Sequence, residues 1–303
     1  MTLFLTRSKA PSYDRLLYLG AITGVVIAAA PTLGWSQPDA AAAEPIPNPE
    51  DGRLVGTSYV SPYFALSYPL PTDWKEGLQG PSPSRTGYYV LDTFVPKGEP
   101  TGTVLIAARD GLFADKPMRD ASSMTRSLSQ SLASHDGMKV DREPSEMTIA
   151  GHVFSRVDYS GIGLYHATFA TDVRCHIVSF NLTARDPDQL ASLAKGLDHL
   201  DFPVRPEDGT SLPLCVRDYA VPANIIHQVP LEMAGPKFVP IPVRLIIGTD
   251  GHVKHVHVIS ASNLQRRSIE EALTQWEFKP YKTDQHAVEI ETGIVFNFKH
   301  GDS

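Results

Sequence analysis

Cysteines and catalytic motifs are what this 303-residue chain has least of. Its two cysteines, Cys175 and Cys215, cannot make a zinc site by themselves, and no Cys-x-x-Cys pair occurs. The sequence also lacks a Gly-x-Ser-x-Gly elbow, a phosphate-binding loop and a dinucleotide fingerprint. We therefore expect no cofactor and no enzymatic activity. The alternative, an enzyme with its site between two domains, has no residues to nominate.

An excess of positive charge is also absent. Lys and Arg number 27 against 34 Asp and Glu, which gives a net charge of −7, and no long run of one sign occurs. Nucleic acids and anionic membrane surfaces bind basic patches. The acidic balance therefore argues against nucleic acid and against a membrane surface as partners.

The one long apolar run lies at the N-terminus. Basic residues precede an uncharged stretch at 16–34, which ends in the small-x-small triplet Gly34-Trp35-Ser36. This order predicts a secretory signal peptide over 1–36, with an uncleaved membrane anchor as the alternative. In both cases the rest of the chain is exported, and the sequence resembles a Gram-negative envelope protein. We expect it in the periplasm after cleavage, or held at the inner membrane through 16–34 without cleavage.

Export would place the two cysteines in an oxidising compartment, where a disulfide can form. The sequence leaves two interpretations open. One is a structural bridge between Cys175 and Cys215, and the other is one buried thiol and one thiol in a linker.

Residues 37–56 are rich in Ala and Pro, which predicts a flexible leader, and a first domain follows over 57–203. Its strand patterns lie at 64–70, 88–95, 103–108, 153–159, 164–170 and 173–181, and its helix patterns at 118–134 and 187–199. Strands followed by helices in this order predict an α+β domain with an antiparallel sheet.

The two predicted helices of this domain have recognisable buried stripes. Met124, Leu128 and Leu132 recur at helical spacing in the first. The second has Asp186 as its expected N-cap and Pro187 as its first helical residue.

Three segments of the first domain resemble the Mog1/PsbP-like fold. They are YFALSYPLPTDW with its Pro-x-x-Trp corner, TIAGHVFSRVDY with a turn at Gly151, and a closing helix that ends in HLDF. The resemblance implies a sheet with helices packed on it. It also implies a binding or assembly role without a reaction.

Residues 204–237 are polar and rich in proline, which predicts an interdomain linker. Its apolar side chains, among them Leu212, Leu214 and Ile225, predict that it packs across the domain junction rather than lying free in solvent.

The last domain, 238–303, begins with a hairpin. Strand 241–247 runs into Asp250-Gly251, and this dipeptide predicts a tight turn with both central residues at positive φ. The return strand places its valines out of strict alternation, which predicts a bulge near Lys254 or His255.

A helix and a final strand complete this domain. Ser268 and Glu271 suggest a capping box. The helix should bury one face and stop at Pro280, its buried positions being Ile269, Ala272, Leu273 and Trp276. Residues 288–298 then alternate strictly, with apolar side chains on one face and Glu289, Glu291 and Asn297 on the other.

The hairpin, the helix ending in Trp276-Glu-Phe278-Lys-Pro280 and the apolar last strand together resemble the TonB C-terminal domain. The family motif residues here are Asp250, Gly251, Trp276, Phe278 and Pro280. The resemblance implies a three-stranded antiparallel sheet of ββαβ topology with one helix across its inner face.

In that family the edge strand accepts an extended peptide from a partner by β-strand addition. Carried over, the resemblance implies a protein partner, with an outer-membrane receptor as one candidate, on a binding edge formed by Glu289, Glu291, Gly293, Val295 and Asn297. The alternative is a plain sheet edge, on which Glu289 and Glu291 prevent aggregation.

The chain departs from the family in two respects. A TonB-type energy transducer needs a permanent membrane helix, which in the family carries a His, and 16–34 contains none. It also needs a long Pro-rich rod, and a folded domain stands in that place. The sequence therefore predicts a non-enzymatic, exported protein-binding module, with a membrane-anchored TonB-family transducer as the alternative.

His255 and His257 lie two residues apart on a strand, so both imidazoles share one face. They could form part of a metal site, but no third ligand lies nearby in the sequence. A solvated strand face is the favoured interpretation, and no metal is expected.

Overall fold

The computed structural model describes residues 46–99, 101–114, 119–203, 212–231 and 240–296. The predicted signal peptide or anchor and the first part of the leader, 37–45, lie outside these residues. In the described part of the chain, no helix is both long and apolar enough to cross a membrane. The end of the predicted leader is ordered, because β1 (Arg53–Val55) pairs with β2 (Ser58–Ser61).

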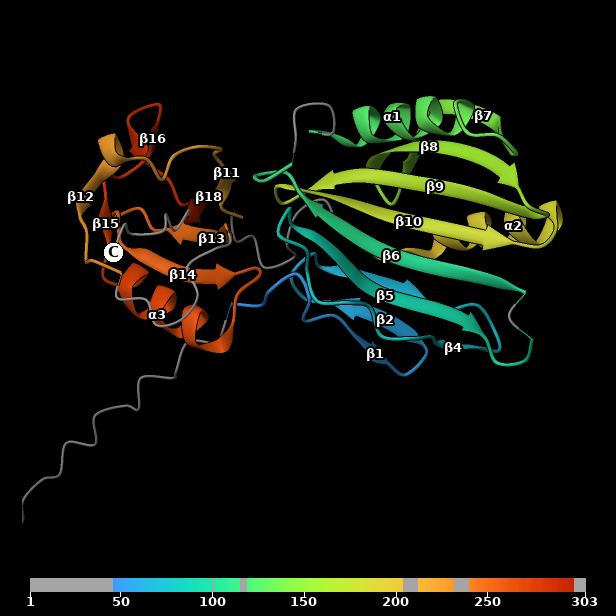
Figure 1. Ribbon diagram of the computed structural model, residues 1–303, viewed down its shortest axis with the longest axis horizontal. Coiled ribbons are helices and arrows are strands. Elements are labelled where there is room, and N and C mark those ends of the chain that lie inside the picture. The colour runs from blue at the N-terminus through green and yellow to red at the C-terminus, as the bar shows by residue number, and fades with distance from the viewer. Residues whose placement is uncertain (1–45, 100, 115–118, 204–211, 232–239, 297–303) are drawn as a thin grey trace, which may run out of the picture. The chain divides into compact units, whose positions relative to one another are not determined.

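The first domain is built on a seven-stranded antiparallel sheet (Figure 1). Its spatial order is β4 (Trp74–Glu76), β5 (Tyr88–Pro96), β6 (Gly102–Asp110), β10 (His176–Ala184), β9 (Leu164–Val173), β8 (His152–Gly161) and β7 (Met138–Ile149). A separate three-stranded sheet contains β1, β2 and β3 (Leu66–Pro69). The α+β class that the sequence predicts is confirmed, while β1, β2, β4 and β7 had no sequence signal.

The two faces of the large sheet have different covers. Phe169 and Ala170 are neighbours on β9 and therefore point to opposite faces. Phe169 belongs to the main core with β1–β3 and α2 (Pro187–Gly196), which a short 3₁₀ turn at Leu197–His199 follows. Ala170 packs with Ala121 of α1 (Ala121–Ala133). Helix α2 begins as predicted, since Asp186 accepts a hydrogen bond from the backbone N of Gln189 at 2.8 Å.

Helix α1 buries a different stripe from the predicted one. Its buried residues are Ala121, Thr125 and Ser129, whereas Met124, Leu128 and Leu132 are half-buried. Small side chains let the helix approach the sheet closely, and Thr125 is hydrogen-bonded through its hydroxyl to Ser155 Oγ at 2.6 Å. Polar residues that satisfy each other across the contact therefore replace the expected apolar stripe.

The main sheet of the C-terminal domain has one strand more than predicted. Its sheet has the order β11 (Leu214–Cys215), β18 (Ile290–Phe296), β13 (Ile241–Ile247) and β14 (Val253–Val258). Strand β11 comes from the predicted linker and pairs in parallel with β18. Two short antiparallel pairs complete the domain: β12 (Ile225–His227) with β15 (Glu277–Phe278), and β16 (Lys282–Thr283) with β17 (His286–Ala287).

Helix α3 (Asn263–Leu273) begins earlier than predicted. Its N-cap is Ser262, which forms a capping box with Gln265 in place of Ser268 and Glu271. The predicted stripe is confirmed, since Ile269, Leu273 and Trp276 are buried against β13 and β18 in one apolar core.

The hairpin turn differs from the predicted type. Gly251 has a φ of 89°, whereas Asp250 is not at positive φ, so the turn is a longer loop closed by one left-handed glycine. A Cβ on Gly251 would also lie 2.1 Å from the carbonyl O of Phe278, so only glycine fits. The bulge predicted near Lys254 is confirmed by the register shift between Ile246 and Ile247.

The described half of the predicted linker packs on the C-terminal domain. Trp276 Nε1 donates to the carbonyl O of Val229 at 3.0 Å, and Lys279 N donates to that of Asn224 at 2.8 Å. Residues 212–231 therefore cover the Trp-x-Phe-x-Pro motif and supply an edge strand.

Candidate functional site: the outer edge of β18 and the face behind it

Strand β18 presents the main-chain groups of alternate residues to its outer edge. It pairs with β13 on its inner side, where Pro242 lies opposite Val295. Proline has no N–H to donate, and its carbonyl O turns to β14 to accept from Ile259 N at 3.1 Å. The pair is therefore not hydrogen-bonded, and the N–H and C=O of Val295 point away from β13.

Strand β11 covers the first part of this edge. Leu214 N donates to the carbonyl O of Glu289 at 2.9 Å, and Val216 N to that of Glu291 at 3.0 Å. The main-chain groups of Glu289 and Glu291 thus already have a strand partner. Among the described residues no strand pairs with Gly293 or Val295 on this side, and the Val295 side chain is 43% exposed. Asn297, the last residue of the predicted edge, lies outside the described residues.

The side chain of Glu291 does not lie exposed at the edge, where the sequence suggested that it prevents aggregation. It is buried at 2% exposure, on the face of the sheet opposite α3. Glu289 remains partly exposed and forms an ion pair with Lys254 at 2.5 Å. The two glutamates therefore have different roles, although they lie two residues apart on one strand.

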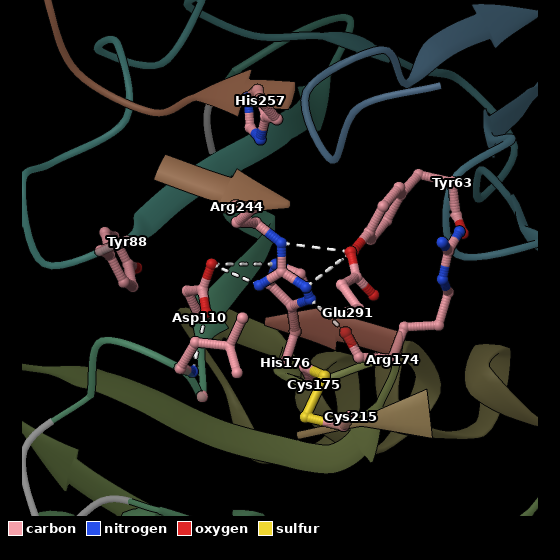
Figure 2. A network of polar contacts seen from close by, with 12 residues as sticks. Tyr63, Tyr88, Asp110, Arg174, Cys175, His176, Cys215, Arg244, His257 and Glu291 are labelled. Carbon is pink, nitrogen blue, oxygen red and sulfur yellow. Dashed lines mark hydrogen bonds and ion pairs between the residues drawn. A yellow bond between two sulfur atoms is a disulfide. The ribbon is translucent and has the colours of Figure 1, made fainter. Parts of the chain in front are cut away.

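Arg244, on β13, is the centre of a buried polar network on this face (Figure 2). Its Nη1 donates to Asp110 Oδ2 at 2.5 Å, and its Nη2 lies 2.8 Å from Glu291 Oε1. Tyr63 donates to the same Glu291 oxygen at 2.8 Å, and its own hydroxyl accepts from Arg244 Nη2 at 3.2 Å. The guanidinium lies between Asp110 on one side and Glu291 with Tyr63 on the other.

The charges of this network are set by burial and by Arg244. Burial raises the pKa of Asp110, which the Arg244 guanidinium lowers only in part. Burial also raises the pKa of Glu291, but Arg244 and Arg174 outweigh it and hold this pKa below its ordinary value. Burial and the charge of Arg244 hold the pKa of His176 well below its ordinary value, so the imidazole is neutral.

These groups include an acid, a base and a phenol, yet the network is closed to substrates. Asp110, His176, Arg244, Glu291 and Tyr63 are each at most 4% exposed. A reacting molecule cannot reach their polar atoms. The arrangement instead fixes the C-terminal sheet to residues of the first domain, because Arg244 pairs with Asp110 and Tyr63 donates to Glu291 across the contact.

The two histidines lie on the same face but are not solvated as predicted. His257 is buried, and its Nε2 lies 2.9 Å from Glu50 Oε1. His255 is half-buried, and its Nε2 lies 3.0 Å from Asn48 Oδ1. Residues of the predicted leader therefore cover this strand. In the part of the chain that the structure describes, no group of three or more potential ligands could hold a metal ion.

Cys175 and Cys215 form a disulfide in the structure, which corresponds to the first of the two interpretations that the sequence left open. Cys175 lies in the turn between β9 and β10, at a φ of 60°, and Cys215 is the last residue of β11. The bridge thus joins the first domain to the added edge strand, close to the buried network (Figure 2).

Residues 240–300 match the family described as the Gram-negative bacterial TonB protein C-terminal. This segment is similar to the TonB C-terminal domain. Its family motif residues lie together in the structure, where Gly251 O accepts from Phe278 N at 2.9 Å next to buried Trp276. The match indicates a protein-interaction role in the cell envelope.

Solved structures with a similar fold include two proteins. Cyanobacterial PsbP from Synechocystis sp. PCC 6803 has 14% identity and a TM-score of 0.36, with 48% of this chain and 91% of that chain covered. LpqN of Mycobacterium tuberculosis, involved in cell envelope biogenesis, has 16% identity and a TM-score of 0.34, with 46% and 83% covered. A search among curated proteins finds no relative of the chain.

Sequence reasoning missed the buried network entirely. Its only sequence signals are Arg244 inside the apolar run IPVRLII and Glu291 inside the last strand. A single charge within a buried strand indicates a buried ionic partner, because charged side chains are almost never fully buried unless paired. The partners Asp110 and Tyr63 are far away in the sequence, so no local pattern could identify them.

Proposed function

We propose that this protein is a non-enzymatic, periplasmic binding module that captures an extended segment of a partner protein at the outer edge of β18. The observation that carries the proposal is the outward direction of the main-chain groups of Val295, which follows from the position of Pro242 opposite it. Such groups on an exposed edge are a template for an added strand.

The neighbourhood of Val295 supports the same role. An added strand gains main-chain hydrogen bonds from the edge and specificity from side-chain contacts. Val295 is apolar and 43% exposed, and it offers such a contact beside the open main chain. An envelope partner, such as an outer-membrane receptor, would supply the extended segment.

The test is Val295→Pro, which removes the outward N–H without removing any hydrogen bond to β13. Val295→Thr is the matched control, because it keeps the N–H, the β-branched shape and the exposure. Immobilised wild-type protein and both variants are incubated with envelope extract of the producing cells, and captured proteins are compared by mass spectrometry. We expect a partner that wild type and Val295→Thr retain and Val295→Pro loses by about tenfold or more, as one central main-chain pairing is lost.

Thermal unfolding of each variant shows whether the fold is intact. Equal capture by Val295→Pro and Val295→Thr, with both folded, would rule out strand addition at this part of the edge. Capture lost equally in both variants would assign binding to the valine side chain rather than to the main chain.

A further inference from the structure

Strand β11 lies where a partner strand would add. It pairs with β18 on the outer side, in parallel, with Leu214 opposite Ile290 and Cys215 opposite Glu291. Its two N–H donors, on Leu214 and Val216, occupy the outward carbonyl groups of Glu289 and Glu291. A partner strand that used the whole edge would have to replace β11.

The side chains of β11 itself contribute little packing, whereas the residues after it are anchored: Val216 packs against the C-terminal core, and Arg217 donates to the carbonyl oxygens of Gly111 and Ala114. Both of its residues are exposed, Leu214 at 45%, and Leu212 just before it is also 45% exposed. A two-residue parallel pairing with exposed side chains is a weak element, because its stability depends on main-chain bonds that water can replace.

The covalent attachment of β11 is through its second residue. Cys215 is bonded to Cys175, in a turn whose neighbouring groups belong to the buried network. The bridge lines a cavity of about 300 Å³ together with Arg174 and Arg217. Cys215 is an exposed residue and lines this cavity, so a reductant can approach the bridge from solvent.

We propose that β11 is a resident strand that blocks the first part of the binding edge, and that the Cys175–Cys215 disulfide keeps it there. Reduction releases β11 and extends the free edge from Gly293 back to Glu289. This inference rests on the proposed function of the edge and names its regulation. The reductant is a dithiol, either a small molecule or a dithiol protein domain.

The chemical step is thiol–disulfide exchange. A thiolate of the reductant attacks the sulfur of Cys215, the S–S bond breaks, and Cys175 leaves as a thiolate that takes a proton from water. The second thiol of the reductant then attacks the mixed disulfide and releases Cys215. Two electrons and two protons pass to the protein, and the reductant ends as a disulfide.

Amide hydrogen exchange tests the release without a partner. In the oxidised protein we expect the amides of Leu214 and Val216 to be protected. After reduction with dithiothreitol, or in Cys175→Ser/Cys215→Ser, we expect their exchange to be at least about tenfold faster while β13 amides stay protected. Val216→Pro, with its disulfide intact, should release Leu214 in the same way, and Leu212→Pro, which alters no bond to β18, should not.

A second measurement tests the vacated edge. The probe is a fluorescent peptide of sequence Leu-Pro-Leu-Ser-Val-Arg, a copy of residues 212–217 with Ser in place of Cys215. Because a tethered strand competes at millimolar effective concentration, the acceptor is Cys175→Ser/Cys215→Ser/Val216→Pro. We expect the probe to bind this variant at least about tenfold more tightly than it binds the oxidised wild type.

The outcomes separate the proposed control of β11 by the disulfide from the proposed binding function of the edge. If the exchange rate of the Leu214 amide did not change on reduction, the proposed release of β11 would be wrong, even if Val295→Pro still abolished partner capture. Faster exchange without tighter probe binding would show that β11 moves but exposes no binding site, which also overturns the proposed control. Faster exchange with tighter probe binding supports it.

Discussion

The two faces of the C-terminal sheet are both buried, but they are buried by different means. The face toward α3 is apolar, with Ile269, Leu273 and Trp276 packed on β13 and β18. The opposite face carries Arg244, Glu291 and His257, which pair with residues from before 111 in the chain. The alternation that distinguishes an inner from an outer face therefore does not distinguish a buried face from a solvated one.

The difference teaches how each face is stabilised. Apolar burial depends on area and shape, so it tolerates conservative change. A buried ion network depends on every partner being present, because one missing partner leaves a buried charge without compensation. The second face should therefore be the more sensitive of the two to single substitutions of polar residues.

The largest expected effect comes from Arg244→Ala. It leaves Asp110 and Glu291 buried without their cation, which should cost about 3–5 kcal/mol in the free energy of unfolding. Urea unfolding followed by circular dichroism measures this loss. Lys254→Ala is the control on the same sheet, because its exposed ion pair with Glu289 is worth at most about 1 kcal/mol. Similar losses in the two variants would contradict a network that depends on burial.

A smaller effect is expected from Gly293→Ala, which tests how closely the second face is packed. A Cβ there would lie 2.8 Å from Phe113 Cζ and 3.2 Å from Leu112 Cβ. Overpacking of this kind costs about 1–3 kcal/mol. Gly98→Ala is the control, since its Cβ would meet nothing within 4 Å. Thermal unfolding of both variants measures the effect. An unchanged melting temperature for Gly293→Ala would show that the packing of Leu112 and Phe113 on Gly293 is loose.

The smallest effect concerns the pair of His257 and Glu50 at the margin of the same face. Burial raises the pKa of Glu50, but the hydrogen bond and charge of His257 outweigh it and, with a smaller effect of Arg266, hold this pKa below 4.5. A lowered folded-state pKa stabilises the fold above the unfolded pKa, and this contribution is lost as the pH falls below 4.5 through the folded value.

Glu50→Gln should therefore reduce stability at pH 7 by about 1 kcal/mol or less and reduce the further loss below pH 4.5. Unfolding in urea between pH 7 and pH 3 measures both. Asn48→Ala removes the neighbouring contact to His255 without removing a titrating group, so it should keep the wild-type pH dependence. An identical pH dependence of Glu50→Gln and wild type would show that Glu50 does not titrate as described.

Local patterns were sufficient for most elements. The strands at 88–95 and 164–170, the cap at Asp186 and the bulge near Lys254 were all predicted, because each depends on residues adjacent in the chain. Sequence patterns failed to predict elements whose burial depends on the segment that packs against them. The small-residue stripe of α1 and the exposed strand β7 bury too little apolar area to leave a sequence signal.

The candidate site was predictable only in part. The alternation of 288–298 located the last strand, and the TonB resemblance made it an edge. No pattern indicated that residues 214–215 would occupy that edge, because a two-residue parallel strand has no period to detect. The cysteines were found, but their bonding depends on a distance between segments 40 residues apart.

The sequence by itself determined most of the C-terminal domain: its hairpin, its helix face, its last strand and the motif that closes it. These follow from short-range alternation and from turn residues whose steric needs are local. Only the tertiary structure decided what lies on the second face and on the edge. Pairing a buried charge or covering an edge requires groups from distant parts of the chain. Local periodicity in the sequence does not predict such long-range contacts.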